Sequence, residues 1–178
     1  MKNIILGVTG SIAAYKAADI ANVLTKQGVG VHVIMTESAC KLITPLTFQT
    51  LTKNKVHTDM WDEYQPSEVQ HISLAKKADL MLIAPATANF IAKAAAGIAD
   101  DMLTTVLAAF INKPVIICPA MNTAMYENPV TQRNIQTLKE LGFTFVDPRE
   151  AMLACGDLGK GALADVDTIL EATEEFLK

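Results

Sequence analysis

An asparagine stands directly after an apolar segment near the middle of the chain. Residues 115–118 are apolar, and the sequence Pro-Ala-Met-Asn-Thr-Ala-Met follows at residues 119–125. In an open parallel sheet, ligands bind at the carboxyl ends of the strands, where the Asn122 amide would offer hydrogen-bond donors and acceptors without a net charge. An isolated asparagine is more simply explained as a helix cap. The ligand-binding interpretation gains weight because other strand ends in this chain carry similar chemistry.

A glycine and a serine follow the first apolar segment, residues 3–8. Gly10 allows a tight turn, and Ser11 can cap a helix whose free N–H groups and positive dipole end suit a phosphate. The pattern is neither G-x-G-x-x-G nor a Walker A loop. Many α/β proteins begin a helix in this way, but the loop could hold the phosphate of a mononucleotide.

The second apolar segment, residues 29–35, ends beside this loop in the predicted sheet. Thr36 and Ser38 would place two small hydroxyl groups there, although each is equally well explained as a helix cap. Glu37 could instead bind a ribose, as in NAD-binding folds. Without the glycine fingerprint, we rank NAD below a flavin mononucleotide.

Residues 85–90 follow the apolar segment 80–84 and contain no bulky side chain before Phe90. Small side chains let a planar ring lie against the backbone, and Thr87 and Asn89 can hydrogen-bond its heteroatoms. Two aspartates precede the next apolar run, where acidic residues favour a helix N-terminus. We expect Asp100 to cap this helix and Asp101 to contact the ligand as well.

One histidine and one cysteine lie in unusual contexts. The sequence Ser-Glu-Val-Gln fits a capping box with Ser67 as the N-cap, which would place His71 in the first helical turn, where the dipole favours a neutral imidazole that can act as a base. A lone histidine is more often structural. Cys155 lies in a glycine-rich loop, residues 154–161, where it packs against little and suits proton transfer or nucleophilic chemistry.

The remaining histidines and cysteines have simpler explanations. His32 and His57 fall in predicted strands and are read as ordinary sheet residues. Cys40 and Cys118 are read as small buried hydrophobic residues.

Apolar segments and helical spacing alternate along the chain, which indicates a parallel sheet with helices on both faces. Strands are predicted at residues 3–8, 29–35, 56–58, 80–84, 115–118 and 143–146. Helices are predicted at residues 11–27, 39–51 with a break at Pro45, 68–77, 88–97, 100–112, 131–141 and 165–177, and a long loop at residues 148–164. With no repeat or linker in the sequence, we expect one domain spanning residues 1–178.

Composition narrows the class of protein. The chain has 178 residues, of which 51% are apolar and 6% aromatic, so the core must be aliphatic. A net charge of −4 without a basic cluster argues against nucleic acid as a partner. The three widely spaced cysteines fit neither a disulfide framework nor a metal site. Residues 3–8 are too few for a signal peptide or a membrane span, so we expect a cytoplasmic protein.

Taken together, these segments resemble the homo-oligomeric flavin-containing cysteine decarboxylase family. The resemblance spans nearly the whole chain and is carried by residues 10–16 (Gly-Ser-Ile-Ala-Ala-Tyr-Lys), 71–74, 85–89, 119–125 and 154–161. The Pro-x-Met-Asn-x-x-Met and Ala-Cys-Gly-Asp segments are highly specific in combination. The fold implied is a Rossmann-like or flavodoxin-like three-layer α/β/α domain with a parallel sheet.

The resemblance also implies a reaction: FMN-dependent decarboxylation of 4′-phosphopantothenoyl-L-cysteine to 4′-phosphopantetheine, a coenzyme A precursor, through a thioaldehyde and an enethiol. His71 would assist the oxidation, Asn122 would hold the substrate carboxylate, and Cys155 would donate the final proton. An amide suits the carboxylate because a strong ion pair would stabilise the group that must leave. The implied FMN-binding residues are Gly10, Ser11, Ile12, Thr36, Ser38, Ala86, Thr87, Ala88, Asn89, Asp101, Ala120 and Met121. The implied substrate-binding residues are Asn122, Ala154, Gly156 and Lys160.

The sequence departs from the family pattern at three positions. Phe90 replaces a common Thr, Tyr126 a frequent Trp, and Ala162 an Arg found in many bacterial members, which puts one phosphate or pantothenate contact in doubt. No ligase domain follows residue 178, so we expect a monofunctional decarboxylase supplied by a separate synthetase. Family members are trimers or dodecamers built from trimers, with FMN near the subunit interface. The mean hydropathy of +0.27 agrees with apolar surface buried between subunits.

Four alternative functions remain. A peptidyl-cysteine decarboxylase would share His71 and Asn122, whereas a flavin prenyltransferase should lack the combination of His71 and Cys155. Relatives that regulate phosphatases typically carry acidic extensions or have lost catalytic residues, and this chain has neither feature. An NAD-binding module is the weakest alternative.

Overall fold

The computed structural model describes residues 1–61, 68–152, 156 and 158–177. Five parallel strands form one sheet in the order β2-β1-β3-β4-β5. Their bounds are β1 Asn3–Val8, β2 Gly30–Met35, β3 Leu80–Ala86, β4 Val115–Pro119 and β5 Thr144–Phe145. This is the strand order of flavodoxin-like sheets, and it confirms the predicted fold class. The strand predicted at residues 56–58 is reduced to a single bridge between Ile34 and His57.

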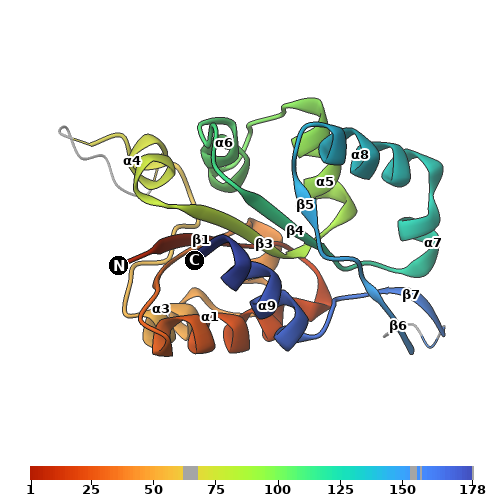
Figure 1. Cartoon of the computed structure of the whole chain (residues 1–178), viewed down its shortest axis with the longest axis horizontal. Coiled ribbons are helices and arrows are strands. Elements are labelled where there is room, and N and C mark those ends of the chain that lie inside the picture. Colours follow the sequence, from red (N-terminus) through yellow and green to blue (C-terminus); the bar gives the residue numbers. More distant parts are fainter. Residues whose placement is uncertain (62–67, 153–155, 157, 178) are drawn as a thin grey trace.

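The strands are apolar on both faces, so the sheet must be covered on both sides. Alternate residues of β1 divide between two cores: Ile4, Leu6 and Val8 face one, and Ile5 faces the other. Figure 1 shows α1, α3 and α9 on one face of the sheet and α4, α5, α6 and α8 on the other. The result is the predicted three-layer arrangement.

The helices agree with the sequence pattern in position more than in their ends. The first layer contains η1 Ile12–Tyr15, α1 Lys16–Lys26, α2 Glu37–Cys40, α3 Pro45–Thr52 and α9 Val166–Leu177. The opposite layer contains α4 Gln70–Lys77, α5 Ala88–Ala96, α6 Met102–Ala108 and α8 Pro129–Glu140. The predicted break at Pro45 is confirmed, because this proline is the first residue of a new helix, α3.

Two predicted helix caps are wrong. Helix α6 begins at Met102, and its N-cap is Asp101 rather than Asp100. Helix α4 begins at Gln70 with Val69 as N-cap and no side-chain cap hydrogen bond. The expected N-cap, Ser67, lies outside the described residues.

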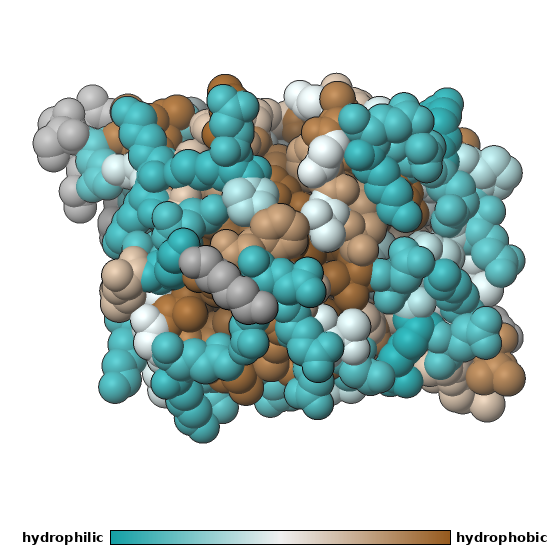
Figure 2. All heavy atoms as spheres, in the orientation of Figure 1, coloured by the Kyte–Doolittle hydropathy of each residue, from teal (hydrophilic) through white to brown (hydrophobic). Residues whose placement is uncertain are grey.

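The segment predicted as one long loop, residues 148–164, instead contains an antiparallel hairpin of β6 Arg149–Met152 and β7 Leu158–Ala162. A short helix, α7 Thr123–Glu127, follows Asn122, the residue that the sequence analysis weighed as a helix cap, although its bounds were not predicted. The hairpin projects beyond the parallel sheet in Figure 1, and Figure 2 shows hydrophobic atoms at the same corner of the molecule. Met152 and Leu158 are large exposed apolar residues of this hairpin.

The two described cysteines differ in environment. Cys118 is fully buried, as predicted, and burial raises the pKa of its thiol. Cys40 is only partly buried, so the prediction of a buried hydrophobic residue is wrong for it. Within the described ranges, no helix is long and apolar enough to cross a membrane.

His32 lies in β2, as predicted, and is buried. Burial first, and then the positive charges of Lys77 and His57, lower its pKa from 6.5 to about 4. Between these two values the unfolded chain binds a proton that the folded chain does not, so the protein loses stability as the pH falls.

We expect this residue to remove about 3 kcal/mol from the free energy of unfolding between pH 6.5 and pH 4, at 1.36 kcal/mol per pKa unit. Denaturant titrations across this range measure the loss. His32→Gln should flatten the pH dependence in the same window. An unchanged slope in that variant would assign the acid sensitivity to other groups.

Candidate functional site

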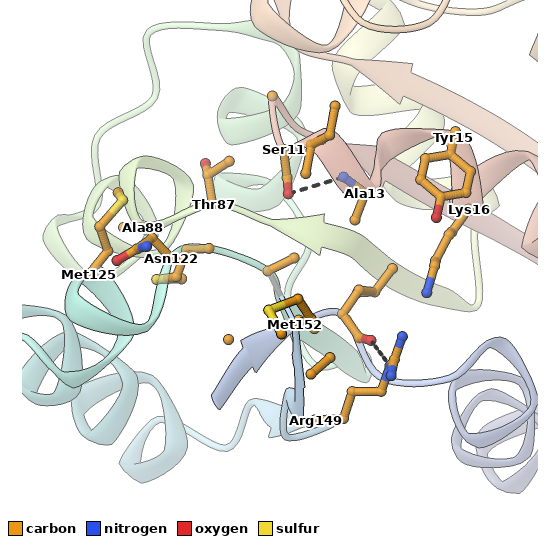
Figure 3. Close-up of a pocket in the computed structure, with 18 residues that line it drawn as sticks. Ser11, Ala13, Tyr15, Lys16, Thr87, Ala88, Asn122, Met125, Arg149 and Met152 are labelled. Atoms are coloured by element: carbon orange, nitrogen blue, oxygen red, sulfur yellow. Dashed lines mark hydrogen bonds between the residues drawn. The ribbon is translucent and has the colours of Figure 1, made fainter. Parts of the chain in front are cut away.

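A cavity of about 510 Å³ opens at the carboxyl ends of β1, β3 and β4. In this strand order, the chain leaves β1 toward β2 on one side while β3 lies on the other, and such a switch point is where open α/β sheets bind ligands. The volume is in the range of small-molecule sites. Its lining residues are Gly10, Ser11, Ile12, Ala13, Tyr15, Lys16, Thr87, Ala88, Ala120, Met121, Asn122, Met125, Arg149, Ala151, Met152, Gly161, Ala162 and Leu163 (Figure 3).

A buried threonine joins the two loops at the switch point. The Thr9 hydroxyl donates to the Pro85 carbonyl at 2.7 Å and accepts from the Thr87 N–H at 3.0 Å. Thr87 in turn caps α5 by accepting from the Phe90 N–H. The loop after β1 and the start of α5 are therefore held together by one side chain.

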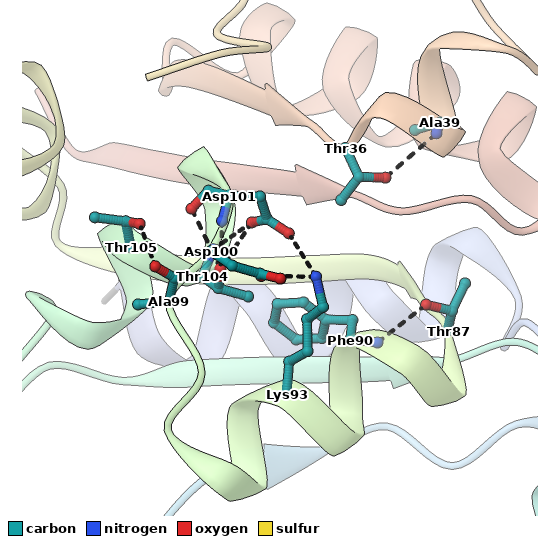
Figure 4. Close-up of polar contacts among 10 residues, drawn as sticks. All are labelled: Thr36, Ala39, Thr87, Phe90, Lys93, Ala99, Asp100, Asp101, Thr104 and Thr105. Carbon is teal, nitrogen blue, oxygen red and sulfur yellow. Dashed lines mark hydrogen bonds and ion pairs between the residues drawn. The ribbon is translucent and has the colours of Figure 1, made fainter. Parts of the chain in front are cut away.

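The loop after β1 packs against the exit of β2. Ser11 caps η1, as predicted, by accepting from the Ala13 N–H. A Cβ atom added at Gly10 would overlap the Ser38 side chain, so only glycine allows this close approach. Thr36 caps α2 through the Ala39 N–H (Figure 4). Thr36 and Ser38 lie beside the first loop, as expected, but neither lines the cavity.

Asn122 is a helix cap, one of the two interpretations weighed from the sequence, and it also lies on the cavity wall. Its Oδ1 accepts from the Ala124 N–H at 2.8 Å and caps α7. The same residue lines the cavity together with Ala120, Met121 and Met125. The side chain is thus fixed by a helix N-terminus at the rim of the pocket.

The β6–β7 hairpin forms the wall opposite these strand exits. The Met121 N–H donates to the Gly161 carbonyl at 2.9 Å. A side chain at Gly161 would collide with the Met121 carbonyl, so glycine is required for the hairpin to dock. Ala162 lies directly across the hairpin from Arg149 in the strand register, and both residues line the cavity.

A family model described as Flavoprotein matches residues 1–178. The chain belongs to the flavoprotein family. It is 52% identical over 177 residues to a "Probable phosphopantothenoylcysteine decarboxylase" of Streptococcus mutans serotype c, with 99% of each chain covered. It is 49% identical over 174 residues to the coenzyme A biosynthesis bifunctional protein CoaBC of Bacillus subtilis strain 168, where the match covers 98% of this chain and 43% of that protein.

A solved structure has the same fold. It is a cysteine-to-serine mutant of PPC decarboxylase in complex with pantothenoylaminoethenethiol. Its TM-score to this flavoprotein is 0.92, with 33% sequence identity, and the alignment covers 99% of this chain and 98% of that one.

The cavity of this flavoprotein brings together eight residues predicted from the sequence. They are Gly10, Ser11, Ile12, Thr87, Ala88, Ala120, Met121 and Asn122. Two charged cavity residues were not predicted as site residues: Lys16, which belongs to the family-like segment 10–16, and Arg149, which belongs to no motif. The hairpin wall could have been anticipated only from the glycines at 159 and 161.

Several predicted site residues lie away from this cavity. Asp101 caps α6 through the Thr104 N–H at 2.8 Å and contacts Lys93, which also pairs with Asp100 (Figure 4). The pKa of Lys93 is raised mainly by its hydrogen bond to Asp100. Lys160 pairs with Asp147 at 3.5 Å. None of the predicted residues Ala86, Asn89, Asp101, Gly156, Lys160 and His71 lines the cavity, and the predicted Ala154 and Cys155 lie outside the described residues.

Thr9→Val tests the hydrogen bonds that join the two loops at the switch point. Valine keeps the shape of threonine but leaves the Thr87 N–H without its partner. We expect the free energy of unfolding to fall by about 2 kcal/mol in chemical denaturation. Thr137→Val is the matched control, since the Thr137 hydroxyl makes an exposed hydrogen bond within α8, and it should cost about 0.5 kcal/mol or less. Equal losses of stability in both variants would contradict the role of the Thr9 hydroxyl in joining the two loops.

Proposed function

We propose that this flavoprotein decarboxylates 4′-phosphopantothenoyl-L-cysteine to 4′-phosphopantetheine in coenzyme A biosynthesis, with FMN as cofactor. The observation that carries the proposal is the cavity at the β1/β3 switch point, which has small residues at the strand exits and the Asn122 amide at its rim. The 52% identical relative, matched over 99% of both chains, bears the name of this activity. We also place the protein in the cytoplasm, where coenzyme A precursors are made.

The residues at the strand exits fit FMN. Gly10 leaves no side chain between the first loop and Ser38, and the N–H groups that follow Ser11 can receive the phosphate. The small side chains of Ala88 and Ala120 leave room at the exits of β3 and β4 for a flat ring to lie against the backbone, and Ala86 stays a proposed FMN contact. When bound, FMN supplies the oxidation of the cysteinyl β-carbon and the later return of a hydride.

We assign the substrate carboxylate to the Asn122 amide. The amide can donate a hydrogen bond to this group without pairing it with a full positive charge, so it orients the carboxylate without stabilising it strongly against loss as CO2. The side chain is held in place by its cap on α7, which reduces the reorganisation needed on binding. Thr36, Ser38, Asn89 and Asp101 remain proposed FMN contacts, and Ala154, Gly156 and Lys160 proposed substrate contacts.

We assign the last proton transfer to Cys155, which lies outside the described residues. A thiol has the acidity to protonate the enethiol carbon near neutral pH and to be restored from water afterwards. The assignment rests on its place in the Ala-Cys-Gly-Asp segment.

We propose that the active form is a homo-oligomer, a trimer or a dodecamer built from trimers, in which a neighbouring copy supplies His71. Two observations support this. No histidine is among the described residues of the cavity wall. In addition, Ile12 and Tyr15 line the cavity while 65% and 59% exposed, which is unusual for large apolar side chains beside a binding site and favours coverage by another subunit.

The first test is the visible spectrum of the purified protein, followed by addition of 4′-phosphopantothenoyl-L-cysteine with mass detection of products. We expect a yellow protein that releases CO2 and forms 4′-phosphopantetheine. Cys155→Ser should release CO2 but accumulate the oxidised enethiol, which is two hydrogens lighter than the product.

A yellow but inactive wild-type protein would point to a peptidyl-cysteine decarboxylase or a flavin prenyltransferase. Full turnover by Cys155→Ser would remove Cys155 from the proton-donor role. A protein that stays colourless with added FMN would contradict the flavin site.

A mixing experiment tests whether His71 acts across subunits. His71→Asn and Asn122→Asp should each be inactive alone. Mixed trimers from coexpression, purified through two different tags, should recover about a third of wild-type activity, since a trimer that contains both variants pairs an intact Asn122 with a neighbour's intact His71 at about one site in three. Randomly assembled dodecamers should recover about a quarter, because some of their trimers contain only one variant. Inactive mixed oligomers, or a monomer in light scattering, would contradict the shared site.

A further inference from the structure

The charge on the cavity wall is one-sided. Lys16 and Arg149 line the cavity, and its described wall contains no aspartate or glutamate. This arrangement occurs in a chain with a net charge of −4. Figure 3 shows the Lys16 side chain descending from the start of α1 and the Arg149 side chain rising from the β6–β7 hairpin, so that their charged ends point toward one another. Two facing cations repel, and an anion between them would remove the repulsion.

The guanidinium of Arg149 is held from one side. Its Nε lies 3.2 Å from the Leu163 carbonyl, to which it donates, and 3.2 Å from the Asp165 carboxylate. Asp165 is 70% exposed, so water screens much of its charge. In the part of the chain that the structure describes, the two Nη groups have no hydrogen-bond partner. They form the planar pair of donors that binds two oxygens of a phosphate at once.

The cations lie away from the proposed carboxylate site. In Figure 3, Asn122 and Met125 stand on one side of the cavity, and Lys16 and Arg149 stand on the other. Ala120, Met152 and Leu163 contribute apolar wall to the same cavity. This order of neutral amide, apolar wall and paired cations matches a substrate with a carboxylate at one end and a dianionic phosphate at the other.

We propose that Arg149, together with Lys16, binds the phosphate of the substrate and that Arg149 sets the preference for a phosphorylated over an unphosphorylated pantothenoylcysteine. This inference rests on the proposed function, because it names the part of the cavity that binds the phosphate end of that substrate. Lys160, which was predicted only as a substrate contact, is not assigned to the phosphate, since its ammonium group pairs with Asp147 and lies over the Tyr126 ring. Arg149 is a binding residue, remote from the carbon that loses CO2.

The kinetic test compares 4′-phosphopantothenoyl-L-cysteine with pantothenoyl-L-cysteine in the FMN-loaded enzyme. Arg149→Gln should lower kcat/KM for the phosphorylated substrate about 10- to 100-fold, the range for a hydrogen-bonded charge. The loss should lie in KM, with kcat retained. Turnover of the unphosphorylated substrate should be unaffected. For the phosphorylated substrate, kcat/KM of Arg149→Lys should lie between those of wild type and Arg149→Gln, because lysine keeps the charge but lacks the planar pair of guanidinium donors.

Two matched variants control for charge and for structure. Arg133→Gln removes the chain's other arginine, which is exposed on α8, and should leave the preference unchanged. Asp165→Asn removes the other partner of the Arg149–Asp165 ion pair and should also leave the preference for the phosphorylated substrate unchanged. Equal losses on both substrates in Arg149→Gln would overturn the proposal. Weakened FMN binding in a fluorescence titration would also overturn it, because the cations would then serve the flavin phosphate.

Calorimetry separates this inference from the proposed reaction. Phosphopantothenate and pantothenate lack the cysteine and need no turnover to bind. The FMN-loaded protein should bind phosphopantothenate at least 10-fold more tightly, and Arg149→Gln should remove most of the difference. This result in a protein without decarboxylase activity would keep the subsite and reject the reaction. Equal binding of the two compounds in wild type would reject the subsite even if decarboxylation were observed.

Discussion

The sheet of this protein is apolar on both faces, and the remaining architecture follows from the need to cover it. A parallel strand with buried residues on each side requires helices above and below. The connections of β1 and β3 must then leave toward opposite edges of the sheet to supply both layers. Where they separate, the strand ends cannot be filled by either helix layer, and the cavity lies at this gap. The position of the site is thus a consequence of core burial, before any functional residue is considered.

Small residues determine what this gap can hold. The close approaches at Gly10 and Gly161 bring two loops and the hairpin within reach of a common ligand, and the Thr9 hydroxyl keeps the exits of β1 and β3 at a fixed separation. None of these three residues needs to react. They set the width of the cavity, whereas the amide and the cations set its polarity. Preorganisation of this kind lets the binding energy of the distant substrate groups be used to orient the group that reacts.

The parallel sheet and much of the cavity were predictable from the sequence because both depend on patterns of neighbouring residues. Continuous apolar runs marked the strands, and the residues after them marked the site. The β6–β7 hairpin was missed because Arg-Glu-Ala-Met and Leu-Gly-Lys-Gly-Ala show no alternation of apolar and polar residues. Asp100 and Asp101 are equivalent as local caps. The structure separates them through Thr104, with which Asp101 completes the capping box. Lys16 and Arg149 are adjacent only in the folded chain, so no spacing could pair them.

The distribution of charge in the cavity fits the proposed binding of a carboxylate by Asn122 and of a phosphate by the two cations. A cation beside the carboxylate would bind the substrate well but would stabilise the ground state more than the transition state, because the negative charge moves away from this group as CO2 leaves. Binding by charge is free of this penalty only at a part of the substrate that does not change. A phosphate far from the reacting carbon meets that condition, since it carries the same charge throughout. In the proposed assignment, a neutral amide at one end and two cations at the other would therefore give affinity without opposing the reaction.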